Sequence, residues 1–373
     1  MSNPIRVLQV LAGMNRGGAE TLVMNLYRNL DRTKVQFDFI LFRKEECDYN
    51  EEIRKLGGNI YWIPRYNGKN HFRYKKAWRT FFKEHPEYRI IHGHVRSTAS
   101  IYLKIAKKYN LSTIAHSHST SSRGSIVEQI FKNAIQYPIR HTADYIFACS
   151  LDAGKWLFGV KALQKDNFKL IPNAIEIKDY KFDKALRKKI RTQMDVRDKC
   201  IIGHIGSFTP PKNHAFLLDV FKTIYDHNKD VAMLLIGDGE LRPQIEKRIK
   251  ELNLADAILL TGVRSDIPAL LQAMDIFVFP SLFEGLGIAV IEAQASGLPC
   301  VLADSIPSEA HVTDLVETLS LNDSLKTWAD TIIAHKGGSR RDSQQEIIKS
   351  GYDIAETAVI LEEHYLAINI EDE

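Results

Sequence analysis

The amino-acid sequence predicts an α/β protein with two domains of similar design. Its 373 residues exceed the usual size of a single domain. Short apolar runs alternate with helical patterns along the chain, which is typical of parallel sheets covered by helices. The order strand, glycine-containing turn, helix occurs near the N-terminus and again after residue 200. The two halves therefore look like two copies of one architecture.

The composition is that of an ordinary globular protein, with 45% hydrophobic and 26% charged residues. The formal charge of +4 is nearly balanced and gives no reason to expect a nucleic-acid partner. Four widely spaced cysteines indicate neither a disulfide framework nor a zinc site. No apolar run reaches about 18 residues and no signal peptide is evident, so we expect a cytoplasmic protein.

The first domain is expected to begin with a strand over Arg6–Ala12, a glycine-rich turn, and a helix that reaches about Leu30. Such a turn can bring backbone N–H groups to a phosphate, although a plain tight turn is the commoner explanation. The turn lacks the Gly-x-Gly-x-x-Gly fingerprint, which counts against an NAD enzyme. Further strands are expected at Gln36–Phe42, Asn59–Ile63, Arg89–His92, Ser112–Ala115 and Asp144–Ala148.

Two pairs of histidines follow strands of this domain. His92 and His94 come at the end of one strand, and His116 and His118 at the end of another. Ligands of parallel sheets bind at the carboxyl ends of the strands, so these side chains are candidates for a site. A metal is one explanation, but no acidic third ligand is evident nearby, and we expect none. An exposed loop histidine is the ordinary alternative.

A helix predicted from Phe72 to about Lys83 is both aromatic and basic. One explanation is a helix that packs its aromatic side chains on the sheet. The other is a basic amphipathic helix that lies on an anionic membrane surface. The sequence leaves both open.

The second half repeats the pattern. A strand over Cys200–Gly206 enters a loop that contains Lys212, and a helix begins near His214. A closing helix is expected over Asp353–Ala367, because its apolar residues recur at helical spacing. The later strands of this half are expected at Ala232–Ile236, Ile258–Leu260, Ile276–Phe279 and Pro299–Leu302.

The most informative stretch is Asp275–Gly297. It reads as a buried strand, a turn, and a short apolar helix over Gly287–Ser296 that Gly297 ends. Two carboxylates interrupt this apolar context: Glu284 lies just before the helix, and Glu292 lies about two turns further in. The helix dipole explains Glu284 alone, and a core salt bridge explains Glu292 alone. The combined spacing is more specific than either carboxylate.

This stretch resembles the signature of retaining glycosyltransferases of family four, whose GT-B architecture sets two Rossmann-like domains across a cleft. The resemblance covers nearly the whole chain in order, including a hinge at Ile171–Ile175. The region Ser305–Pro307 is most similar to bacterial exopolysaccharide and capsule transferases. The resemblance implies an acceptor domain over residues 1–172, a nucleotide-sugar domain over residues 173–351, and a C-terminal helix over residues 352–373 that returns to the first domain.

The resemblance also implies roles for individual residues. Glu284 would orient the donor sugar, and His118, with His116 as second choice, would face the sugar being transferred. Ser207 stands where the family usually has an arginine. The implied catalytic residues are Glu284, His118 and Lys212, and the implied nucleotide-sugar-binding residues are Arg16, Gly17, Gly18, Lys212, Arg264, Gly285, Leu286, Gly287 and, for the ribose, Glu292.

The expected function is transfer of a sugar from a UDP-sugar to a saccharide or polyprenyl-linked acceptor, with retention of configuration. The chain has no Asp-x-Asp motif, so a lysine and helix N-termini are expected to neutralise the leaving diphosphate without a metal or cofactor. Peripheral contact of the first domain with the inner face of the cell membrane is one of the two explanations that the aromatic and basic helix leaves open. Two alternatives stay open: a nucleotide-sugar epimerase of the same fold, and a non-catalytic sugar-binding protein, which Ser207 favours.

Overall fold

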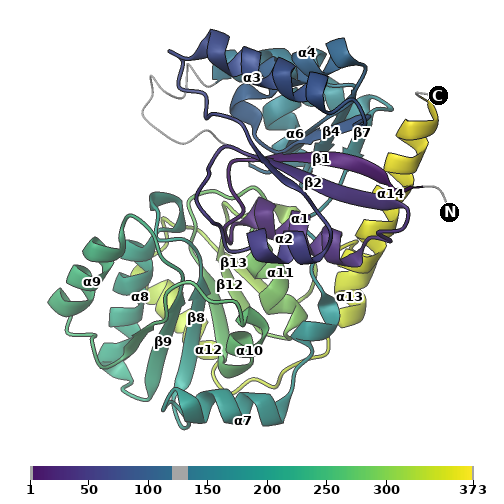
Figure 1. Ribbon diagram of the computed structural model, residues 1–373. Coiled ribbons are helices and arrows are strands. Elements are labelled where there is room, and N and C mark those ends of the chain that lie inside the picture. The colour runs from purple at the N-terminus through teal and green to yellow at the C-terminus, as the bar shows by residue number, and fades with distance from the viewer. Residues whose placement is uncertain (1–2, 120–132, 372–373) are drawn as a thin grey trace. The chain divides into compact units, whose positions relative to one another are not determined.

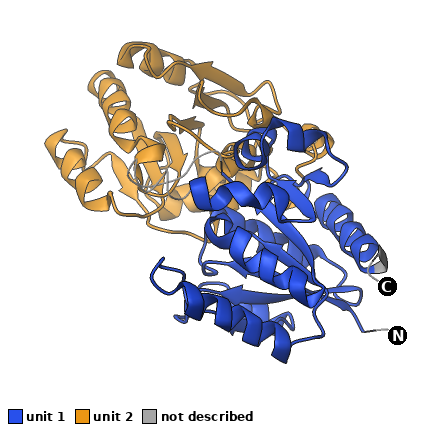
Figure 2. Ribbon diagram, turned by 90° about the horizontal axis from the view of Figure 1, so that it is seen from above, with its two compact units in different colours: residues 1–175, 353–373 blue, residues 176–352 orange. Residues whose placement is uncertain are grey.

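The computed structural model describes residues 3–119 and 133–371, which form two compact units (Figures 1 and 2). Unit 1 contains residues 1–175 and 353–373, and unit 2 contains residues 176–352. The divisions follow residues 175 and 352, whereas the sequence placed them after residues 172 and 351. Each unit is built on one parallel β-sheet, so the predicted fold class of two Rossmann-like α/β domains is confirmed.

The sheet of unit 1 has seven strands in the order β3-β2-β1-β4-β5-β6-β7. Side chains of β1 alternate between two buried cores, with Val7 and Leu11 in one and Leu8 and Val10 in the other. A sheet buried on both faces explains why its strands are mainly apolar. The strands are β1 (Ile5–Leu11), β2 (Val35–Leu41), β3 (Ile60–Trp62), β4 (Ile90–Gly93), β5 (Ser112–Ser117), β6 (Tyr145–Ala148) and β7 (Phe168–Leu170).

Helices cover both faces of this sheet. In α3 (His71–Glu84) the side chains of Tyr74, Trp78 and Phe82 are buried in the core, so packing against the sheet explains most of its aromatic residues. Phe72 is different, because 87% of its surface is exposed. The other α-helices among the described residues of this unit are α1 (Gly18–Asn29), α2 (Asn50–Lys55), α4 (Ala99–Ala106), α6 (Leu151–Phe158) and α14 (Ile354–Glu371).

The C-terminal helix α14 belongs to unit 1 although the whole of unit 2 precedes it in sequence. It packs against α1 and against β1, β2 and β4, as its yellow ribbon shows in Figure 1. Ile354, Leu361 and Tyr365 lie in the same core as the side chains of β1. The predicted return of this helix to the first domain is therefore confirmed.

The sheet of unit 2 has six parallel strands in the order β10-β9-β8-β11-β12-β13. These are β8 (Cys200–Ile205), β9 (Val231–Ile236), β10 (Ile258–Leu260), β11 (Ile276–Phe279), β12 (Cys300–Ala303) and β13 (Val316–Leu319). The helices are α7 (Lys184–Gln193), α8 (His214–His227), α9 (Arg242–Glu251), α10 (Ile267–Ala273), α11 (Ile288–Ala295), α12 (Leu325–Ala334) and α13 (Gln344–Lys349).

Two edge strands, β7 and β13, were not predicted from the sequence. Both are short and partly exposed, and polar residues such as Lys169, Glu317 and Thr318 interrupt their apolar runs. A strand buried on one side only has no need of a continuous apolar pattern. Among the residues that the structure describes, no helix is both long and apolar enough to span a membrane.

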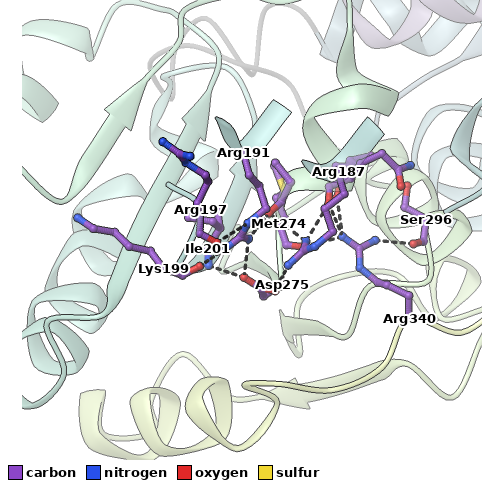
Figure 3. A network of polar contacts seen from close by, with 12 residues as sticks. Arg187, Arg191, Arg197, Lys199, Ile201, Met274, Asp275, Ser296 and Arg340 are labelled. Atoms are coloured by element: carbon purple, nitrogen blue, oxygen red, sulfur yellow. Dashed lines mark hydrogen bonds and ion pairs between the residues drawn. The ribbon is translucent and has the colours of Figure 1, made fainter. Parts of the chain in front are cut away.

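A network of arginines joins α7 to the beginning of β11 (Figure 3). Asp275 accepts from Arg187 at 2.6 Å and from Arg191 at 3.1 Å. Arg340 donates to the carbonyl oxygens of Ser296 and Met274, at 2.5 and 2.6 Å, and so reaches the last turns of two helices. Desolvation, followed by the charge of Arg187, lowers the pKa of Arg340 to about 9. This network connects α7, the beginning of β11 and the C-terminal ends of α10 and α11.

Candidate active site

Lys212 and Glu284 form an ion pair in unit 2. Lys212 lies in the loop after β8 and Glu284 in the loop after β11, and these strands are neighbours in the sheet. The Nζ of Lys212 is 2.6 Å from Oε1 of Glu284, and the two side chains are only 17% and 13% exposed. The backbone N–H of Leu282 donates to the carbonyl of Pro211 at 2.7 Å, which joins the two loops. The structure thus brings two predicted site residues together.

The surroundings of Lys212 are shaped by an aromatic ring and by glycines. Its Nζ lies 4.6 Å from the ring centroid of Phe279, a geometry that favours a cation. A Cβ on Gly206 would lie 3.1 Å from Cδ of Lys212, and a Cβ on Gly237 would lie 2.0 Å from the carbonyl oxygen of Gly206. Gly237 also has a φ of +144°, which favours glycine. Glycines therefore let the ends of β8 and β9 approach closely beside the lysine.

Glu292 is the second carboxylate of the signature. It lies on α11, which begins after Gly287 at a φ of +84°. The hydroxyl of Tyr180 donates to its Oε1 at 2.7 Å, and burial raises its pKa to about 7. Within residues 3–119 and 133–371, no cationic side chain forms an ion pair with Glu292, so the explanation of a core salt bridge is wrong. The carboxylate keeps acceptor capacity beyond its bond with Tyr180.

The other residues of interest in unit 2 lie in the loops that follow β8, β10 and β11. Gly285 and Leu286 precede α11, and Leu286 is buried. Arg264 forms a two-bond ion pair with Asp266, at 2.8 and 2.7 Å, on the surface. Ser207 is exposed, and its hydroxyl lies 3.2 Å from that of Thr209. The guanidinium of Arg264 is therefore engaged in a local ion pair.

The glycine turn of unit 1 leads directly into α1. Gly17 is the N-cap of this helix and Gly18 its first residue. A Cβ on Gly18 would meet no atom of the described chain within 4 Å, so the turn is open there. The backbone N–H of Arg16 donates to Asp48 at 3.0 Å, and its guanidinium lies 5.2 Å from the ring centroid of Tyr49. An open helix N-terminus of this kind can approach an anion.

The four histidines of unit 1 form one stacked cluster at the ends of β4 and β5. Ring centroids are 4.3 Å apart for His92 and His94, 5.1 Å for His94 and His118, and 4.0 Å for His116 and His118. Burial lowers the pKa of all four, and the charge of Arg96 further lowers that of His118, to about 3. The cluster is therefore neutral at physiological pH.

Candidate ligand atoms of three of these histidines, His92, His94 and His116, all lie within 4.8 Å of one another. The rings of His92 and His116 are nearly parallel, at 10°, so their lone pairs do not converge on one point. Both nitrogens of His94 are already hydrogen-bonded, to His118 and to Gln9. The arrangement is a stack of hydrogen-bonded rings and does not have the geometry of a metal centre.

Several polar partners at these sites were missed from the sequence. Tyr180 follows the hinge in the sequence, and no sequence pattern indicates its hydrogen bond to Glu292. Gln9 carries a weak signal, because it is a polar residue within an otherwise apolar strand. Tyr365 lies on the apolar face of α14, and nothing in the sequence indicates that its hydroxyl bonds to Gln9 and His92. Contacts between distant segments are decided by the tertiary fold.

Comparison with known proteins matches both halves of the chain to glycosyltransferase families. Residues 16–179 match the family described as Glycosyltransferase Family 4, and residues 199–335 match Glycosyl transferases group 1. The chain is 36% identical over 360 residues to a putative glycosyltransferase, EpsF, of Bacillus subtilis, and the match covers 94% of each chain. It is 24% identical over 374 residues to a capsular polysaccharide biosynthesis glycosyltransferase, CapH, of Staphylococcus aureus, with 97% and 99% covered.

Solved structures share the fold. The structure of Anabaena Alr3699/HepE in complex with UDP and glucose matches with a TM-score of 0.81 at 18% identity, and the match covers 97% of this chain and 100% of that one. A glycosyltransferase from Rickettsia africae matches with a TM-score of 0.77 at 19% identity, over 98% and 99%. With the match to EpsF over nearly its full length, these findings lead to one conclusion: the chain belongs to the glycosyltransferases of family 4 and group 1, which have the GT-B fold.

Proposed function

We propose that this glycosyltransferase moves a sugar from a UDP-sugar to a saccharide or polyprenyl-linked acceptor, with retention of configuration, in exopolysaccharide or capsule synthesis. Unit 1 would bind the acceptor and unit 2 the donor. CapH, which is named a capsular polysaccharide biosynthesis glycosyltransferase and matches along almost its whole length, supports the polysaccharide role. An Escherichia coli relative named as a UDP-Gal-dependent α-1,3-galactosyltransferase acting on a diphosphoundecaprenol acceptor, 30% identical over 58% of each chain, supports the donor and acceptor classes.

The observation that carries the proposal is the Lys212–Glu284 ion pair, with Glu292 on the following helix. Cleavage of the sugar–phosphate bond leaves negative charge on the diphosphate. Lys212 would neutralise that charge, exchanging its contact with Glu284 for the phosphate oxygens. Glu284 would then be released to accept hydrogen bonds from sugar hydroxyls. Glu292 would accept from the ribose hydroxyls, and the amides of Gly285, Leu286 and Gly287 would lie along the phosphates.

Retention follows from attack on the face that the leaving group vacates. The acceptor hydroxyl would attack the anomeric carbon while the bond to the phosphate oxygen breaks. The proton of that hydroxyl would pass to the departing phosphate. In this scheme Glu284 and His118 orient the donor sugar and no enzyme group becomes covalently attached. Arg16, Gly17 and Gly18 would complete the donor site, with Arg264 near the base.

A panel of nucleotide sugars tests the proposal. Binding raises apparent stability by mass action, so the correct donor is expected to raise the melting temperature most. That donor is then incubated with isoprenyl diphosphate sugars, and NMR of the product reports its anomeric configuration. Retention with transfer supports the proposal, and inversion contradicts it. Release of free sugar or an epimer without acceptor indicates the epimerase, and binding without turnover indicates a sugar-binding protein.

We further propose that α3 and the neighbouring strand β3 bring unit 1 to an anionic membrane surface. Phe72 and Trp62 are 87% and 43% exposed. Trp62, Arg73 and Lys76 line a hollow of 380 Å³ on this surface. Exposed aromatic and basic side chains together suit the interface of an anionic bilayer.

Sedimentation with phosphatidylglycerol vesicles tests this contact. The Phe72→Ser and Arg73→Ser double variant is expected to sediment less than wild type. Val359→Ser, at an apolar position on α14 that is 55% exposed, serves as the control. Equal binding to phosphatidylcholine vesicles, or equal loss in the control, would contradict the proposal.

A further inference from the structure

A continuous chain of hydrogen bonds crosses unit 1 from the C-terminal helix to His118. Tyr365 on α14 contacts Gln9 on β1, with Nε2 of Gln9 3.2 Å from the tyrosine oxygen. Oε1 of Gln9 lies 2.8 Å from Nε2 of His94. Nδ1 of His94 lies 2.8 Å from Nε2 of His118. The chain thus connects segments that are up to 356 positions apart in sequence.

Each hydrogen in this chain is decided by the group before it. The amide of Gln9 donates through Nε2 to Tyr365, so its carbonyl oxygen faces His94. A carbonyl oxygen only accepts, and therefore Nε2 of His94 carries a hydrogen. A neutral imidazole holds one hydrogen, so Nδ1 of His94 is bare and accepts from His118. His118 then carries its hydrogen on Nε2 and leaves Nδ1 bare.

The far end of the chain is consistent with this direction. The hydroxyl of Tyr365 accepts from Gln9 and has one hydrogen to give. Nδ1 of His92 lies 2.6 Å from the same hydroxyl and can accept that hydrogen. Burial lowers the pKa of His92, His94 and His118, so each ring is neutral. A neutral ring carries its one N–H hydrogen on a single nitrogen. The directions of the bonds to His94 and His118 therefore follow from the orientation of the Gln9 amide.

Two acceptor atoms at the end of this chain are left for a ligand. Nδ1 of His118 and Oδ1 of Asn173 are both buried without a hydrogen-bond partner in the described part of the chain. The Asn173 side chain lies beside the His118 ring and would accept a hydrogen bond from it when that ring is protonated, which raises the pKa of His118. Unpaired buried acceptors cost free energy unless a donor such as a hydroxyl fills the place.

We propose that Gln9 and His94 are positioning residues that hold His118 in the tautomer with hydrogen on Nε2, so that Nδ1 accepts a hydrogen bond from a substrate hydroxyl. The substrate part rests on the proposed function, whereas the tautomer is a property of the free protein. This series of hydrogen bonds, the relay, also gives α14 a role in the site, because Tyr365 orients the amide of Gln9. A sugar hydroxyl is the ligand chemistry that this end of the relay fits.

Histidine labelled with ¹⁵N tests the tautomer directly in the free full-length protein. Long-range ¹H–¹⁵N spectra at neutral pH separate bare from protonated ring nitrogens, and the His118→Gln spectrum assigns the signals. The expected result is a bare Nδ1 and a protonated Nε2 in wild-type His118. A protonated Nδ1 there overturns the inference, whether or not the protein transfers sugar.

A pair of variants tests the part played by Gln9. Gln9→Met keeps the side-chain length but removes both hydrogen bonds, and is expected to give mixed tautomers of His118. Phe147→Leu is the matched control, because Phe147 packs against the rings of His92 and His116 but forms none of these hydrogen bonds. Loss of one oriented hydrogen bond should lower kcat/KM about tenfold in Gln9→Met, through KM for the donor, and much less in the control. Unchanged tautomers in folded Gln9→Met, or equal changes in both variants, overturn the proposal.

Discussion

The ammonium of Lys212 and the carboxylate of Glu284 lie 2.6 Å apart although 72 positions separate them in sequence. Their strands, β8 and β11, are parallel neighbours, so the loops that follow open on the same edge of the sheet. The pair is largely shielded from water, which strengthens its interaction. In the proposed mechanism each partner is released when a diphosphate or a sugar binds. This exchange is the basis of the first prediction.

Lys212→Ala should lower turnover by about two orders of magnitude, the usual scale for loss of one preorganised group that stabilises charge. The effect should fall on kcat more than on nucleotide affinity, because the diphosphate gains charge in the transition state. Steady-state kinetics with the identified donor measure both. Lys222→Ala, at an ion pair on the outer surface of α8, is the control. Unchanged turnover in Lys212→Ala would remove the phosphate assignment.

Ser207→Arg should strengthen donor binding or leave it level. Ser207 is exposed, so a longer side chain has room, and a guanidinium can form two bonds to a phosphate. Calorimetric titration with the nucleotide diphosphate compares the variant with wild type, and Ser207→Gln controls for size. Weaker binding by a folded Ser207→Arg protein would mean that another group already occupies the phosphate position.

Glu292→Gln should stabilise the free protein at pH 8 and have little effect near pH 4.5. The folded-state pKa of Glu292, about 7, lies above the ordinary glutamate value of 4.5, so the folded state loses stability as pH rises between these values. Removing the charge should recover about 2–4 kcal/mol above pH 7. Denaturant unfolding at several pH values measures this difference. A stability difference that is constant with pH would contradict the raised pKa.

Replacing Glu292 should weaken nucleotide binding, although it should stabilise the free protein above pH 7. Glu292→Ala should weaken binding by about 1.5–3 kcal/mol, the range for hydrogen bonds to a charged group. Glu284→Ala should lower turnover with less effect on nucleotide affinity. Titration calorimetry with UDP distinguishes the two carboxylates. If Glu292→Ala binds UDP as tightly as wild type, the ribose role is incorrect.

Asp275→Asn should destabilise the fold by about 3 kcal/mol without changing donor affinity. Asp275 is the carboxylate that pairs with Arg187 and Arg191, and Arg340 lies in the same network (Figure 3). Removing one partner leaves buried cations uncompensated. Chemical unfolding gives the change in free energy, and Asp226→Asn, in an exposed ion pair of α8, is the control. Equal effects of the two variants would contradict a structural role for the network.

Activity should survive chelation with EDTA, because a lysine and helix ends are proposed to carry the phosphate charge. The assay compares initial rates before and after exhaustive dialysis against the chelator. Complete loss of activity that manganese restores would overturn the account of the leaving group. Partial loss accompanied by a lower melting temperature would instead indicate a metal that stabilises the fold.

Much of the architecture was predictable because local patterns carry it. Strands buried on both faces must be continuously apolar, and the turns after them contain glycine, so the two-domain parallel design was evident from the sequence. The half-exposed strands β7 and β13 lack that pattern and were missed. The ends of most other elements agree within one or two residues, as at α3 and β11.

The sequence by itself also determined which residue types are available: a carboxylate before α11, a second on α11, a lysine after β8, and two histidine pairs after β4 and β5. Only the tertiary structure decided their partners. Strand order makes Lys212 and Glu284 neighbours, burial against Tyr180 raises the pKa of Glu292, and the return of α14 sets Tyr365 against Gln9. Hydrogen bonds and pKa values depend on distance and dielectric, which are properties of the folded chain.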